Sequence, residues 1–141
     1  MTDYSVTGGC LCGEVKFKIT GHLNLFQYCH CSRCQKVTGT AFATNLFVNE
    51  DQFEWLSGED KLTQFKLPDA KYFSTCFCRT CGSNLPWQPT GTTRRVVPAG
   101  SLDQDPEIKP AQHIHFASNA PWHIHNDSLP TFDEMPPRKP K

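Results

Sequence analysis

The chain has 141 residues, the usual size of one domain, and we expect a single domain over residues 1–141. Its 14 Lys+Arg residues balance 14 Asp+Glu residues, so the formal net charge is zero, which argues against a protein that binds nucleic acid through its phosphates. The N-terminus lacks the basic and apolar run of a secretory signal and no segment is apolar enough to span a bilayer, so we expect a cytoplasmic protein without membrane contact.

In the first half of the chain, a glycine turn at Gly8-Gly9 precedes the first predicted strand. Alternating or continuous apolar residues predict three strands, at residues 14–20, 41–48 and 52–56. Between the first two lies the run of cysteines at residues 29–34. Residues 32–37 could form one or two helical turns, with Ser32 as the cap and Gly39 as the stop.

The sequence of the second half of the chain predicts a hairpin and further short strands. Residues 62–67 alternate, Pro68-Asp69 makes a turn, and residues 72–77 return toward the last cysteines. Two more short strands are expected at residues 95–97 and 113–116. Prolines after Ala120 predict extended, irregular chain packed over the sheet. The chain is therefore expected to be mainly β.

Three cysteine clusters carry the most specific signal. They are Cys10-x-Cys12, Cys29-x-Cys31-x-x-Cys34 and Cys76-x-Cys78-x-x-Cys81. A C-x-x-C segment lets two sulfurs reach one zinc ion, and in C-x-C an extended backbone would place both side chains on one side. Two such pairs from distant segments make a closed four-sulfur site. Pairing Cys10 and Cys12 with Cys78 and Cys81 would join the N-terminal strand to the later hairpin.

The middle cluster offers three sulfurs: Cys29, Cys31 and Cys34. Three protein ligands and an open fourth position are typical of catalytic zinc. The alternative is that Cys76 supplies a fourth thiolate and closes this site as well. Cys76 could also face the first site or be an ordinary buried thiol.

Other uses of the eight cysteines fit less well. In a reducing compartment, metal ligands are favoured over disulfides, and bridges between such near neighbours have poor geometry. A thioredoxin-like redox role needs an alternating β/α context, which the chain lacks.

Several ordered motifs resemble a known family. They are Gly9-Cys10-Leu11-Cys12-Gly13, Cys29-His30-Cys31-Ser32-Arg33-Cys34 with Gly39 behind it, Phe77-Cys78-Arg79-Thr80-Cys81-Gly82-Ser83, Ala99-Gly100-Ser101-Leu102-Asp103, Ala120-Pro121-Trp122 and Leu129-Pro130-x-Phe132. From about Gly8 to Pro136 the chain resembles the glutathione-dependent formaldehyde-activating enzyme family, which also contains centromere protein V. Cys76 and His115 are departures from the family pattern.

The resemblance implies a β-tent fold of several coiled antiparallel sheets with two zinc ions per chain. It places a structural zinc on Cys10, Cys12, Cys78 and Cys81, and the second on Cys29, Cys31 and Cys34. It also implies a carbon–sulfur lyase of the S-(hydroxymethyl)glutathione synthase type. Fold transfers more safely than substrate within such a family.

The chemistry of zinc agrees with that activity. Zinc lowers the pKa of a bound thiol, so a substrate thiolate could fill the open position of the three-cysteine site and attack formaldehyde. Glutathione or another small thiol and an aldehyde are the expected partners. The main alternative is a binding module in which both zinc ions are structural. Nucleic-acid binding through zinc knuckles is a third hypothesis, disfavoured by the neutral charge.

Several other polar and aromatic residues are weaker candidates. The pairs His113/His115 and His123/His125 would each face one way on a strand and could form a third metal site, although hydrogen-bonding histidines are more common. His30 is expected to point away from the metal beside it. Three basic residues could meet the carboxylates of glutathione or be solvated surface charge: Arg33, Lys36 and Arg79. Trp87 and Trp122 are expected to pack in the fold.

Overall fold

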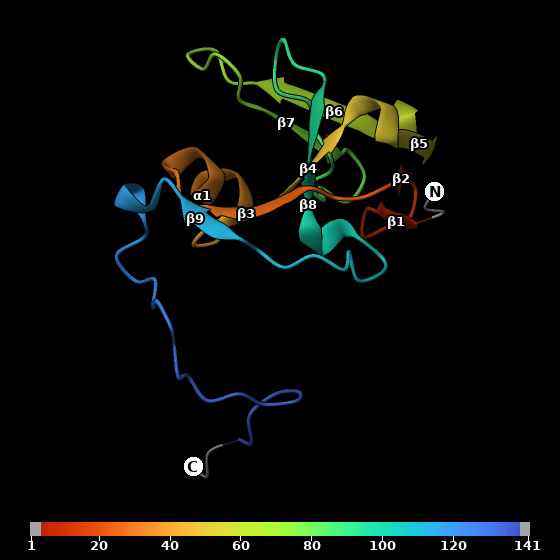
Figure 1. Ribbon diagram of the computed structural model, residues 1–141. Coiled ribbons are helices and arrows are strands. Elements are labelled where there is room, and N and C mark those ends of the chain that lie inside the picture. The colour runs from red at the N-terminus through yellow and green to blue at the C-terminus, as the bar shows by residue number, and fades with distance from the viewer. Residues whose placement is uncertain (1–3, 139–141) are drawn as a thin grey trace.

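Three β-sheets carry the fold of residues 4–138, the part of the chain that the computed structural model describes (Figure 1). The strands are β1 Ser5–Gly9, β2 Lys16–Thr20, β3 Leu25–Cys29, β4 Ala43–Asn49, β5 Phe53–Ser57, β6 Leu62–Lys66, β7 Ser74–Cys78, β8 Arg94–Pro98 and β9 Gln112–Ile114. One α-helix, α1 Ser32–Thr38, lies between β3 and β4. The 3-10 turns are η1 Glu50–Gln52, η2 Glu59–Lys61, η3 Ala99–Ser101 and η4 Phe116–Ser118.

The sheets have the orders β1-β2-β5, β8-β4-β3-β9 and β6-β7. All strand pairs are antiparallel except β3 and β9, which run parallel. The expectation of a mainly β fold made of several antiparallel sheets is therefore confirmed, with β9 as the exception. The predicted hairpin is also confirmed, because β6 pairs with β7 in a register that sets Leu62 opposite Cys78.

One apolar core joins the three sheets. Phe17 and Ile19 of β2 are fully buried while the ends of that strand are exposed, which is the expected alternation. They belong to a buried cluster with Leu46 of β4, Leu85, and Cys78 of β7. The sheets therefore hold the strand ends, and the cysteines attached to them, in fixed relative positions.

The residues Gly8-Gly9 form the end of β1 rather than the expected turn. A Cβ atom at Gly8 would lie 2.4 Å from Cζ of Phe17 and 2.5 Å from the carbonyl oxygen of Ser101. Glycine is needed here for close packing of three segments, which sequence alone does not distinguish from a turn.

The helix α1 is bounded by a cysteine and a glycine. The N-terminal cap is Cys31 and not the expected Ser32. The Sγ atom of Cys31 accepts a hydrogen bond from the amide of Cys34 at 3.3 Å. Gly39 ends the helix in the left-handed conformation, with φ of 69°, as predicted. The same local geometry that caps the helix thus brings two cysteines of the middle cluster together.

The C-terminal segment differs most from expectation. Strand β9 ends at Ile114 because His115 adopts a left-handed backbone with φ of 54°, so the predicted strand over residues 113–116 is too long. Beyond Asn119 the chain is irregular. Ala120 is buried and His123 and His125 still contact side chains in and next to the sheet, but the rest of the segment runs away from the sheets instead of packing over them (Figure 1). Trp122, expected to pack, is 67% exposed. None of the helices in residues 4–138 is long and apolar enough to cross a membrane.

Candidate metal centres and active site

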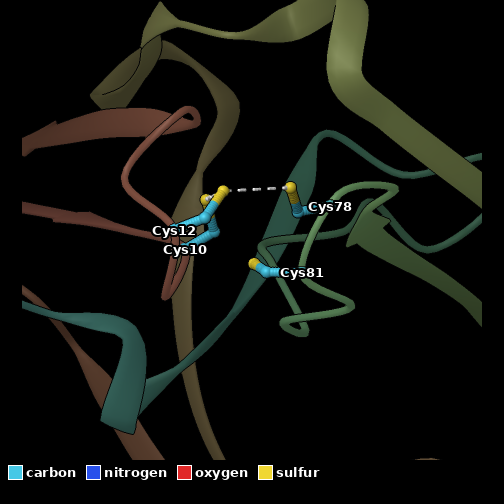
Figure 2. A group of neighbouring side chains, drawn as sticks. All are labelled: Cys10, Cys12, Cys78 and Cys81. Carbon is cyan, nitrogen blue, oxygen red and sulfur yellow. Dashed lines mark hydrogen bonds between the residues drawn. The ribbon is translucent and has the colours of Figure 1, made fainter.

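Two turns from distant parts of the chain bring four cysteines together (Figure 2). The four sulfurs lie within 4.8 Å of one another and belong to Cys10, Cys12, Cys78 and Cys81. The Sγ atoms of Cys10 and Cys12 are 3.5 Å apart, and those of Cys12 and Cys78 are 3.9 Å apart. A tetrahedron with zinc–sulfur bonds of about 2.3 Å has sulfurs about 3.8 Å apart. The group therefore fits one tetrahedral metal ion.

Both cysteine pairs lie on tight turns. The amide of Gly13 donates to the carbonyl of Cys10, and the amide of Gly82 donates to the carbonyl of Cys78. We expected Cys10 and Cys12 on extended chain, but they lie in a turn after β1. The Leu11 amide also donates to Oγ of Ser83 at 2.9 Å, which joins the two turns directly. The turns, rather than strand alternation, aim these sulfurs at one point.

The pKa values of these thiols show the effect of crowding. Hydrogen bonds from Ser83 lower the pKa of Cys81 to about 5. A backbone hydrogen bond from Glu14 lowers the pKa of Cys12, but desolvation and the neighbouring sulfurs outweigh it and raise that pKa to about 12. Four adjacent thiols cannot all ionise without a counter-charge, which a divalent cation would supply. The donor set therefore suits a cation that takes cysteine thiolates.

The second group contains only Cys29, Cys31 and Cys34, whose sulfurs also lie within 4.8 Å of one another. Cys29 ends β3, and Cys31 and Cys34 lie at the start of α1, so one short segment supplies all three. A hydrogen bond from Cys34 lowers the pKa of Cys29 to about 5, while the same contact raises the pKa of Cys34. One thiolate is thus held by neighbouring thiols, and this group could also hold a metal ion.

Cys76 is not part of either group. It is 3% exposed on β7, inside the apolar core, and burial raises the pKa of its thiol to about 11 although Arg95 acts in the opposite direction. Among residues 4–138, no fourth Cys, His, Asp or Glu joins the three-cysteine group at its spacing. The structure therefore does not support the alternative in which Cys76 is a fourth ligand of this group.

The three-cysteine group opens into a cleft of about 520 Å³. Arg33 and Lys71 line it and are exposed, and His115 lines it as well. Tyr72, Phe73 and Trp87 supply aromatic walls, so Trp87 contributes to the cleft as well as to packing. Of the three basic residues considered from sequence, Arg33 lines this cleft, whereas Lys36 and Arg79 do not. The cleft combines thiols with positive charge.

Residues 71–73 also line the cleft, although they were not among the site residues expected from sequence. They lie in the connection between β6 and β7, about 40 positions from the cysteines they approach. A basic residue followed by two aromatic ones in a hairpin loop is a weak hint of binding, and only tertiary structure places it beside α1.

The histidines form an aromatic cluster instead of a third metal group. His30 is fully buried, and its Nε2 lies 2.7 Å from Nδ1 of His113. The rings of His123 and His125 contact this pair, but the nitrogens of these four residues do not reach the ligand spacing of the cysteine groups. His115 lines the cysteine cleft instead, because the strand ends before it. Burial lowers the pKa of His30, which turns into this cluster.

Comparison with known proteins agrees with the fold. A Rhodobacter sphaeroides protein of known crystal structure shares the fold, with a TM-score of 0.56 and 20% identity over 76% of this chain and 98% of its own. The family model described as glutathione-dependent formaldehyde-activating enzyme matches residues 5–118, which include every cysteine discussed above. The resemblance is confirmed over these residues, whereas the motifs at residues 120–122 and 129–132 lie beyond the match. This chain belongs to the glutathione-dependent formaldehyde-activating enzyme family.

Proposed function

We propose that this protein is a zinc-dependent carbon–sulfur lyase of the S-(hydroxymethyl)glutathione synthase type. It would join a small thiol, glutathione in the first instance, to an aldehyde and catalyse the reverse cleavage. The observation that carries the proposal is a group of three thiols, with no fourth ligand among residues 4–138, at the wall of a cationic cleft. Family membership supports the same reaction class.

The two cysteine groups would have different roles. Zinc at Cys10, Cys12, Cys78 and Cys81 would have all four positions filled by the chain and would be structural. A second zinc ion at Cys29, Cys31 and Cys34 would supply a Lewis acid that keeps a substrate thiol ionised at neutral pH. The metal is proposed from the all-sulfur donor set, which suits zinc among the common divalent ions.

Residues of the cleft would bind and orient the substrates. Glutathione carries two carboxylates, and the exposed cations of Arg33 and Lys71 are placed to bind them. Asn45 lines the same cleft, and its carboxamide N–H can donate to the aldehyde oxygen as negative charge develops there. His115 is the imidazole of the cleft, and its ring nitrogen can accept the thiol proton and return it to that oxygen.

Thiols add to aldehydes without a catalyst, so the test is a rate enhancement. Exchange between glutathione, formaldehyde and the hemithioacetal is followed by two-dimensional exchange NMR, with and without protein that contains two zinc ions per chain. We expect faster exchange with the wild type and the Cys76→Ala variant, and the uncatalysed rate with Cys31→Ser. A fully metallated wild type that leaves the exchange rate unchanged would contradict the proposal.

The alternative function is a zinc-stabilised module that binds a protein partner. It is favoured by the extended C-terminal segment after Asn119, where large apolar side chains are exposed: Trp122, Ile124, Leu129, Phe132 and Met135. In that case both metal ions would be structural, and added thiol would not change the coordination of either. Cobalt substitution tests this, because a thiol that enters the coordination sphere changes the visible spectrum of the ion.

A further inference from the structure

A second space adjoins the three-cysteine group at Cys34. It is a cavity of about 170 Å³ between α1, β4 and β7. Four residues line both this cavity and the cleft: Cys34, Asn45, Phe73 and Trp87. The two spaces therefore border the same side chains, among them one proposed metal ligand, Cys34, and the amide proposed to hold the aldehyde oxygen, Asn45.

The two spaces have opposite character. The cleft contains Arg33, Lys71 and His115, whereas no Lys, Arg, His, Asp or Glu among the described residues lines the cavity. Its apolar walls are Val37, Phe42, Ala43, Leu85 and Pro98 together with the shared aromatic residues. Leu85 is fully buried and Ala43 nearly so, which makes this wall part of the protein interior. An anionic thiol fits the cleft, and an uncharged apolar group fits the cavity.

Formaldehyde carries two hydrogens on its carbonyl carbon and has no group to place in such a cavity. An apolar cavity of about 150 Å³ is large enough for a benzene ring and poorly suited to water. A substituent there would remove apolar surface from water at the point where the aldehyde carbon meets the thiol. The size and the lining of the cavity thus suit an aldehyde with a larger, apolar substituent.

We propose that the aldehyde partner of this enzyme carries an apolar substituent of about the size of a phenyl ring, and that this cavity binds it. The inference rests on the function proposed above. In the reaction, the thiol sulfur forms a bond to the carbonyl carbon while the C=O π electrons move to oxygen. That oxygen takes the proton released by the thiol, so the product is an aryl hemithioacetal and no oxidant or reductant is needed.

The test compares aldehydes of increasing size with glutathione as the thiol: formaldehyde, acetaldehyde, benzaldehyde and 1-naphthaldehyde. For each, the catalysed rate is divided by the uncatalysed rate, which removes differences in intrinsic reactivity. We expect this ratio to rise at least about tenfold from acetaldehyde to benzaldehyde, the scale on which small apolar groups are discriminated. It should fall again for naphthaldehyde, whose second ring exceeds the cavity.

Two substitutions at one position change the cavity in opposite directions. Val37 lines the cavity from α1 and is 37% exposed, so a larger side chain can enter the cavity with little strain on the core. Val37→Phe should lower the benzaldehyde ratio more than the formaldehyde ratio, and Val37→Ala should raise the naphthaldehyde ratio. Leu56→Phe is the matched control, because Leu56 is a half-exposed residue of β5 that lines neither space.

Binding is measured separately with benzyl alcohol, which cannot react with a thiol. Calorimetry should detect saturable binding to the wild type and Leu56→Phe, and at least about tenfold weaker binding to Val37→Phe. The inference would be overturned if the reaction with formaldehyde were accelerated, the rate ratio for benzaldehyde were no higher than for acetaldehyde, and benzyl alcohol did not bind. The proposed function would then still stand. If no aldehyde is accelerated by protein with two metal ions, both are overturned.

Discussion

The two cysteine groups differ in where their sulfurs come from and in what surrounds them. The four-cysteine group joins turns whose cysteines are 66 positions apart, at Cys12 and Cys78, and its members complete a tetrahedron. The three-cysteine group comes from residues 29–34 alone and faces a cleft with Arg33 and Lys71. A metal ion in the first would hold distant segments together, whereas one in the second would organise a few residues around an open position. The same ligand chemistry can therefore serve stability or reactivity according to chain separation and ligand number.

The largest expected effect is on folding, from loss of the four-cysteine group. Cys12 is exposed on a turn, so Cys12→Ser removes a sulfur without emptying the core. We expect one metal ion per chain instead of two and a free energy of unfolding lowered by about 4 kcal/mol or more, since losses of this size are typical of a lost metal site. Urea unfolding and elemental analysis measure the two quantities. Retention of both ions with an unchanged midpoint would show that this group is not structural.

Loss of the three-cysteine group should affect the reaction more than the fold. Cys31→Ser is the sharpest change, because serine can replace the sulfur as the helix cap that accepts from Cys34. We expect catalysed thiol–aldehyde exchange to be at least about 100-fold slower. Changing a residue that only hydrogen-bonds to a metal ligand costs up to about 100-fold, and loss of the ligand itself should cost more. The free energy of unfolding should fall by only about 1 kcal/mol. A variant with normal exchange would remove this group from the mechanism.

Metal removal compares the two groups in the unmodified protein. With a chelator, release of metal should occur in two phases, and catalytic exchange should end with the first phase while the far-ultraviolet dichroism persists. Loss of ordered structure in the first phase would reverse the roles assigned to the two groups.

The sequence predicts those features of the two cysteine groups that depend on residues close together in the chain. The cysteine groups follow from C-x-C and C-x-x-C spacing, and the strands around Phe17 and Ile19 follow from alternation. The hairpin of β6 and β7 follows from its turn residues. The cleft cannot be predicted in this way, because it depends on where the loop with Lys71 and Tyr72 packs relative to α1. No periodicity in the sequence encodes that packing.

The errors near the C-terminus have the same origin. Two H-x-H pairs predict aligned side chains only if both lie on strands, and the left-handed backbone of His115 ends β9 before its second histidine. That single conformation directs His115 to the cleft and leaves His113 in contact with His30. Histidine adopts a positive φ more often than most residues, but the surrounding structure decides which of the six histidines does so.

Removing positive charge from the cleft should change KM for the thiol substrate by a smaller factor than loss of a cysteine changes the exchange rate. Arg33→Ala removes one exposed cation, so we expect KM for glutathione to rise by about fivefold, the scale of a solvent-exposed ion pair. KM for the uncharged thiol 2-mercaptoethanol should not change. Lys36→Ala is the matched control, since Lys36 is an exposed cation of α1 that does not line the cleft. Equal effects of both substitutions on glutathione would mean that only net charge matters.

The smallest effect is expected at the cysteine outside both groups. Cys76→Ala should keep two metal ions per chain and normal exchange with formaldehyde, which has no substituent to place in the cavity that Cys76 lines. Its free energy of unfolding should be lowered by about 1 kcal/mol for one small buried group. Its pKa is raised from 9.0 to about 11 by burial, so the folded state holds this proton more tightly than the unfolded chain. Ionisation therefore destabilises the fold as pH rises from about 9 through 11, and the wild type should lose its advantage over Cys76→Ala in that range. Loss of a metal ion in this variant would instead make Cys76 a ligand and close the site that the proposed reaction needs open.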